Sequence, residues 1–85
     1  MVMKKEMFKV FSFVDVEDLH MFIKGGMKYE LDDSCNQIYY CSYEGSDFID
    51  AFQFMENFQK EFGYELLCEC EKGIFDMNEL EEVYN

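Results

Sequence analysis

Large apolar residues occupy both alternate sets of positions in MFKVFSFV, residues 7–14. Phe8, Val10 and Val14 fall on one side of an extended chain, and Phe11 and Phe13 fall on the other. A strand that is apolar on both sides is typical of a sheet interior covered on both faces. We therefore expect an interior strand here.

The hydrophobic period changes from two residues to 3.6 at the carboxylates that follow this strand. Asp15 is expected to cap a helix, with Glu17 and Asp18 in the first turn, where negative charge favours the helix dipole. Gly25 and Gly26 are expected to end the helix. Its apolar stripe consists of Val16, Leu19, Phe22 and Ile23.

The segment 27–44 predicts a β-hairpin. Residues 27–33, MKYELDD, place Met27, Tyr29 and Leu31 on one face and charged residues on the other. Residues 37–44, QIYYCSYE, form the returning strand, and the turn residues DDSCN lie between the two strands.

The segment 46–63 predicts the longest helix, with Ser46 as N-cap, Asp47 in the first turn and Gly63 at the C-terminal stop. Its apolar face consists of Phe48, Ala51, Phe52, Met55, Phe58 and Phe62. Ile49 lies on the polar side and Phe54 at the margin. A core on the apolar face does not explain these two residues.

The last part of the chain predicts a strand and a short helix. In residues 64–73, YELLCECEKG, the side chains of Leu66, Cys68 and Cys70 share one face. Asp76 and Glu79 have the spacing of a capping box that opens a helix. The element order β-α-β-β-α-β-α predicts an α+β fold, a single mostly antiparallel sheet with helices packed on one face, and one domain over residues 1–85.

The charge of −12 changes the expected class of partner. Residues 1–29 carry five Lys against four acids, residues 30–85 carry two Lys against fifteen acids, and there is no Arg. Binding to nucleic acid or to anionic membranes is disfavoured, because both depend on Lys and Arg. A protein partner with a basic surface is expected instead.

The candidate chemistry is sparse. Cys68 and Cys70 form a C-x-C pair, whereas zinc sites usually take a C-x₂₋₄-C knuckle, so these residues, Cys35 and Cys41 are expected to be reduced and mostly buried. His20 is the sole histidine and lacks an orienting third group. The acids match no calcium loop. We expect no enzyme, catalytic residue, metal or cofactor, and a cytoplasmic protein, since no signal-peptide core follows the first lysines.

The chain resembles the C-terminal domain of the MecA family of bacterial adaptors. The resemblance rests on FKVFSFVDVEDLHMFIKGG at the start, the paired tyrosines of QIYYCSY, a long helix of acids and aromatics, EKGIF, and the terminal LEEV. It implies a domain that docks on the Clp-type AAA+ unfoldase ClpC. The separate substrate-recruiting domain of such adaptors has no counterpart in this sequence.

Two functions fit these features of the sequence. The first is a non-enzymatic, acidic protein-binding module, similar to an adaptor domain that docks on a Clp-type unfoldase. The alternative is a small acidic inhibitor, encoded by a phage or mobile element, that mimics DNA and blocks a CRISPR or restriction nuclease. The predicted protein-binding residues lie on the long helix, outside its apolar face: Ile49, Asp50, Phe54, Glu56, Asn57 and Glu61.

Overall fold

A computed structural model describes residues 7–32 and 37–84. Its strands are β1 (Phe8–Asp15), β2 (Lys28–Leu31), β3 (Ile38–Gly45), β4 (Leu67–Cys70) and β5 (Gly73–Phe75). Its helices are α1 (Leu19–Lys24), α2 (Phe48–Phe62) and α3 (Met77–Tyr84). The element order is therefore β-α-β-β-α-β-β-α.

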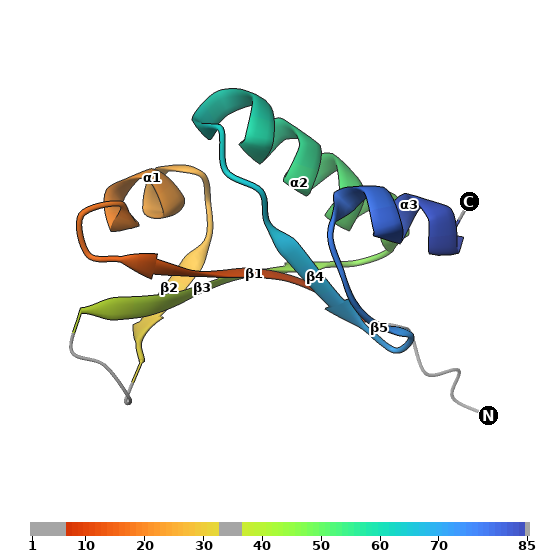
Figure 1. The fold of residues 1–85 in the computed structure, drawn as a ribbon, viewed down its shortest axis with the longest axis horizontal. Helices are drawn as coiled ribbons and strands as arrows, with labels where there is room; N and C mark the ends of the chain where they lie inside the picture. Colours follow the sequence, from red (N-terminus) through yellow and green to blue (C-terminus); the bar gives the residue numbers. More distant parts are fainter. Residues whose placement is uncertain (1–6, 33–36, 85) are drawn as a thin grey trace.

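The strands form one antiparallel sheet in the order β2-β3-β1-β4-β5, and the helices pack against one side of it (Figure 1). The first six elements have the split β-α-β arrangement of ferredoxin-like folds. The predicted α+β class with helices on one face is confirmed. The prediction missed β5, because three residues after a tight turn are too few to show a period-two pattern.

The core lies between the sheet and the helices. Phe22 of α1 is fully buried in it, with its ring centroid 4.9 Å from that of Phe58 and 5.1 Å from that of Tyr64. Buried residues come from every helix and from the central strands: Phe8, Val10, Val14, Phe22, Met27, Cys41, Ala51, Met55, Phe58, Leu66, Cys68 and Leu80. Leu66 and Cys68 are buried and Cys70 is half-buried, so the predicted inward set of the fourth strand is confirmed.

The start of α1 differs from the prediction. Asp15 is the last residue of β1 rather than a helix cap, and the helix begins only at Leu19, after a turn in which the Asp18 amide donates to the Asp15 carbonyl at 3.0 Å. Because Val16 precedes the helix, it falls off the helical stripe and is exposed, as is Ile23. The inward residue of this six-residue helix is Phe22.

The predicted end of α1 is confirmed and has a local cause. The Gly26 amide donates to the Ile23 carbonyl, and the Met27 amide donates to the Phe22 carbonyl, both at 3.1 Å. This is the Schellman pattern, which needs the positive φ of 91° at Gly26. Met27 and Phe22, the residues that usually touch in this motif, are both buried.

The predicted long helix is confirmed, with a shifted cap. Asp47 rather than Ser46 is the N-cap, because its side chain accepts the Asp50 amide at 2.8 Å. The helix ends at Gly63 in the left-handed conformation, with φ 74°. On its apolar face Ala51, Met55 and Phe58 are buried, and the other predicted residues, Phe48, Phe52 and Phe62, are half-buried.

β1 is central in the sheet, as predicted, but helices cover only one of its faces. Phe8, Val10 and Val14 face the helices, whereas the side chain of Phe13 on the opposite face is 58% exposed. Within residues 7–32 and 37–84, no element covers that second face (Figure 1). The expectation of burial on both faces is therefore wrong for the described part of the chain.

The hairpin of β2 and β3 is confirmed by its register, in which Tyr29 lies opposite Cys41. Tyr29 and Leu31 are nevertheless exposed on β2, which lies at the edge of the sheet. Residues 33–36 of the predicted DDSCN turn, Cys35 among them, lie outside the described residues. No helix in the described ranges is long and apolar enough to cross a bilayer.

Candidate protein-binding site

The predicted binding residues lie outside the buried stripe of α2, on a surface that we call the α2 outer surface: Ile49, Asp50, Phe54, Glu56, Asn57 and Glu61. Ile49 is 57% exposed, Asn57 and Glu61 are also exposed, and Glu56 is half-buried. By helical spacing, Asp50, Phe54, Asn57 and Glu61 form one line along the helix, and Ile49 and Glu56 belong to the next.

Asp50 is part of the cap of α2. Its carboxylate accepts the Ser46 amide at 2.9 Å and the Tyr43 hydroxyl at 2.8 Å. These two donors hold the pKa of Asp50 below its ordinary value, with the Ser46 amide as the larger cause. Together with the Asp47 cap, Asp50 forms a variant of the capping box, so its first role is structural.

Phe54 is also held by the fold. Its ring stacks on the Tyr43 ring with the centroids 3.9 Å apart and the planes 4° from parallel, and its centroid lies 6.0 Å from that of Phe58. Phe54 therefore presents only part of its ring to a partner. From the sequence, packing in the core does not explain Phe54. The structure explains it by the contact of its ring with Tyr43 of β3.

Three of the six predicted residues meet at a surface depression beside α1, which we call the α1–α2 depression. Phe54, Asn57 and Glu61 line it together with Gly25, Phe58 and Phe62, around a volume of about 230 Å³. Gly25 lies so close to α2 that a Cβ added there would be 2.5 Å from the Phe58 ring. The absence of a side chain at Gly25 therefore lets α1 approach α2 at this point.

The α1–α2 depression combines aromatic walls with an anionic rim. The rings of Phe54, Phe58 and Phe62 line its apolar part, and Glu61 places an exposed carboxylate at its edge. A Lys or Arg side chain has the matching chemistry, because its apolar stem packs on rings while its charged head pairs with a carboxylate or stacks on a ring face.

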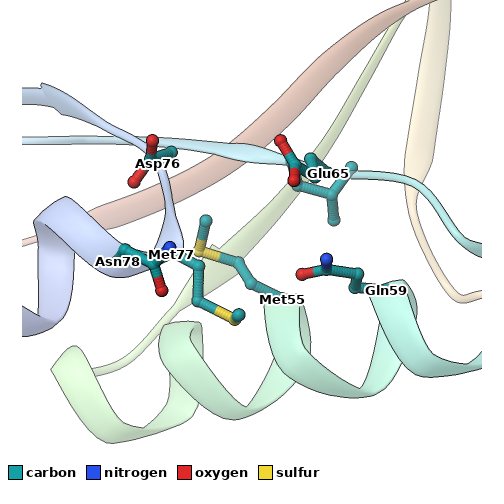
Figure 2. A pocket seen from close by; sticks show the side chains of 7 residues that line it. Met55, Gln59, Glu65, Asp76, Met77 and Asn78 are labelled. Carbon is teal, nitrogen blue, oxygen red and sulfur yellow. The ribbon is translucent and has the colours of Figure 1, made fainter.

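A second pocket lies between α2 and α3, with a volume of about 180 Å³ (Figure 2). The side chains of Met55 and Met77 approach one another across it from the two helices, and polar groups of Gln59, Glu65 and Asn78 surround them.

The capping box predicted at the start of α3 is confirmed. The Glu79 amide donates to the Asp76 carboxylate at 2.8 Å, and the Asp76 amide donates to the Glu79 carboxylate at 3.1 Å. Asp76 is thereby committed to starting α3.

The sequence interpretation missed the face of the sheet that the described helices leave uncovered, which we call the open sheet face. Phe11, Phe13 and Tyr40 form a ring cluster on it, with centroids 5.2 to 6.2 Å apart. The Lys9 ammonium lies 5.4 Å from the Tyr40 ring centroid. The signal is the second apolar set of residues 7–14, which the sequence pattern predicts to lie on a covered face.

The candidate chemical residues lie apart. Cys41 and Cys68 are buried in the core, where burial raises the pKa of the Cys41 thiol, and Cys70 accepts a hydrogen bond from the Tyr84 hydroxyl at 3.3 Å. His20 is exposed on α1, with its Nδ1 3.1 Å from the Glu17 carbonyl oxygen. Among residues 7–32 and 37–84, no three His, Cys, Asp or Glu side chains are grouped to hold a metal ion. No family model, curated protein or solved structure matches the chain.

Proposed function

We propose that this chain is a non-enzymatic, acidic protein-binding module that docks on a basic surface of a Clp-type AAA+ unfoldase, as the MecA-type resemblance suggests. The observation that supports the proposal is the α1–α2 depression, which the rings of Phe54, Phe58 and Phe62 line together with Glu61. The proposed location is the cytoplasm of a bacterial cell or of a phage-infected host.

The charge on α3 supports a partner of opposite sign. Glu81 and Glu82 occupy the last turn of this helix, which carries no basic residue there. Acids at a helix C-terminus oppose the helix dipole and cost stability, by roughly 0.3–1 kcal/mol each where they are exposed. Since helix formation does not favour them, electrostatic attraction of a basic partner gives these carboxylates a role.

In the proposed docking, the carboxylates and the aromatic rings of the α2 outer surface have different roles. Exposed carboxylates steer a basic partner and raise the rate of encounter, whereas the aromatic walls of the α1–α2 depression hold a side chain once it has entered. Ile49, on the adjacent line of the helix, adds apolar contact area. Asp50 and Phe54 support this surface mainly by holding α2 in place.

Calorimetric titration of the purified chain into a purified Clp-type unfoldase tests the proposal. Replacing Asn57 with Trp fills the α1–α2 depression, and we expect it to weaken binding at least about tenfold, or 1.4 kcal/mol. Glu71→Trp is the control, because Glu71 is also exposed but lies in the turn between β4 and β5 and does not line the depression. Absence of binding by the parent chain, or equal binding by both variants, would reject the proposal.

The inhibitor function keeps a specific observation in its favour. Glu79, Glu81 and Glu82 are all exposed on one short helix, and carboxylates three residues apart on a helix lie about 5–6 Å apart, close to phosphate spacing along a DNA strand. If the chain acts as a DNA mimic, excess duplex DNA should displace it from a CRISPR or restriction nuclease. Undiminished nuclease binding in the presence of DNA rules out mimicry.

A further inference from the structure

The open sheet face carries an apolar patch that the helices cannot reach. Ring and aliphatic side chains on alternate positions of four strands form it: Phe11, Phe13, Ile38, Tyr40, Leu67 and Ile74. Phe13 and Ile74 are 58% and 55% exposed. A sheet face that carries apolar side chains is usually buried against another layer of structure. An exposed apolar patch on such a face therefore indicates a contact surface.

Charges of both signs surround the patch. In the register of the sheet, Lys9 lies opposite Glu44 on β3 and Glu69 on β4, so a cation is flanked by two carboxylates in one row. Lys28 and Glu30 lie on the same face of β2, and Asp15 ends β1. The open sheet face therefore holds two of the chain's lysines and only a small part of its charge of −12.

We propose that the open sheet face binds a second copy of this chain, sheet against sheet, about a twofold axis. A twofold interface places the same patch on both sides, so the Phe11, Phe13 and Tyr40 cluster packs on its own copy and a Lys can face a Glu. The apolar patch can pack on its copy, and the Lys and Glu side chains around it can pair across the interface. The strongly acidic helical side of the molecule would repel another copy and remains outward.

The size of the face predicts a weak dimer. With strands about 4.8 Å apart and a rise of about 3.4 Å per residue, the five strands, three of them short, present a projected area of about 500 Å². Two copies would thus bury on the order of 1,000 Å², near the lower end of specific interfaces. We therefore expect a dissociation constant in the range of about 1 to 100 μM.

A single-stranded nucleic acid is the other class of ligand that stacks on exposed sheet aromatics. The composition disfavours it, because the chain contains no Arg and its net charge of −12 repels a phosphate backbone. A second copy carries the same total charge, but salt at about 0.15 M screens charges beyond about 8 Å, while the two patches meet directly. The second copy is therefore the favoured occupant.

This inference does not depend on the proposed function. In a sheet-to-sheet dimer the helices of both copies face outward, so both α1–α2 depressions stay accessible (Figure 1). The dimer would present two docking surfaces to one partner assembly. Linked binding sites of this kind gain avidity without new contacts at either site.

Sedimentation equilibrium of the full chain, over a concentration series of about 5 to 500 μM, tests the dimer. We expect the mass to rise from that of the monomer to that of the dimer. Phe13→Glu should hold the protein monomeric throughout, while Ile49→Glu should leave the dimer unchanged. Phe13 and Ile49 have similar exposed fractions, 58% and 57%. The two substitutions therefore add the same charge at equally exposed positions on opposite sides of the molecule. Circular dichroism checks that both variants fold.

The salt dependence separates this contact from docking on a basic partner. Raising the salt concentration should strengthen the dimer, because it screens repulsion between two acidic chains, whereas it should weaken binding to a basic surface. A parent chain that stays monomeric across the series overturns the inference, as does equal disruption by both variants. Binding of a single-stranded oligonucleotide that Phe13→Glu abolishes would assign the open sheet face to nucleic acid instead.

Discussion

Phe54 of α2 lies face to face on Tyr43 of β3, with ring centroids 3.9 Å apart and ring planes 4° from parallel. The Tyr43 hydroxyl also donates to the Asp50 carboxylate at 2.8 Å. One tyrosine of the sheet thus holds two of the six residues expected to contact a partner. The relationship fixes α2 over the sheet and leaves Ile49, Asn57 and Glu61 as the free part of the α2 outer surface.

Phe54→Ala should lower the free energy of unfolding by about 2 kcal/mol, because it removes a half-buried ring and its stack on Tyr43. Ile49→Ala, on an exposed side chain of the same helix, should change it by less than about 0.5 kcal/mol. Urea unfolding followed by circular dichroism measures both values. Equal destabilisation would mean that Phe54 does not support the fold as described.

Asp50→Asn should lower stability at neutral pH by about 1 kcal/mol, since it weakens the cap of α2. The fold lowers the pKa of Asp50, so the carboxylate's contribution is complete above its unfolded pKa of about 4 and is lost as the pH falls through the folded value. Unfolding curves of the parent and the variant should therefore converge below about pH 4. A difference that persists unchanged into acid would contradict this role.

Most of the helices and strands follow from local signals in the sequence. The end of α1 depends on Gly25 and Gly26, and the start of α3 depends on Asp76 and Glu79, all within four residues of the features they set. The N-cap of α2 is Asp47, one residue after the predicted Ser46. Both residue types are good caps, and the structure identifies Asp47 because its carboxylate accepts the Asp50 amide.

The binding surfaces were less predictable, because they depend on contacts between distant segments. Phe54 is at the margin of its own helix and is held by Tyr43, eleven positions earlier, which no helical period reveals. Gly25 lines the α1–α2 depression only because α1 packs beside α2. The exposure of Phe13 required knowing that every described helix lies on the other side of the sheet.

Gly25→Ala should destabilise the protein by about 1–3 kcal/mol, because the added Cβ would meet the Phe58 ring at 2.5 Å in a packed region. Gly63→Ala gives a useful comparison. That position has a positive φ of 74° but no atom within 4 Å, so its cost should come from backbone strain alone, about 1 kcal/mol. Partner affinity should fall for Gly25→Ala only, since only Gly25 lines the α1–α2 depression.

Thiol titration of the denatured chain should find four free thiols, and elemental analysis should find no stoichiometric zinc. In the folded protein, Cys41 and Cys68 should react slowly with a thiol reagent because both are buried, and Cys41 also has a raised pKa. Cys70, which is half-buried, should react before them. One equivalent of tightly held zinc, or rapid reaction of Cys41, would contradict this prediction.

The most direct test of the proposed docking is the association rate constant with a purified Clp-type unfoldase, measured at low and high salt. Glu61→Lys should slow association about three- to tenfold and reduce its salt dependence, because it reverses the charge at the rim of the α1–α2 depression. Glu71→Lys makes the same charge change in the turn between β4 and β5, and should have little effect. Equal slowing by both variants, or by neither, would contradict docking through the α2 outer surface.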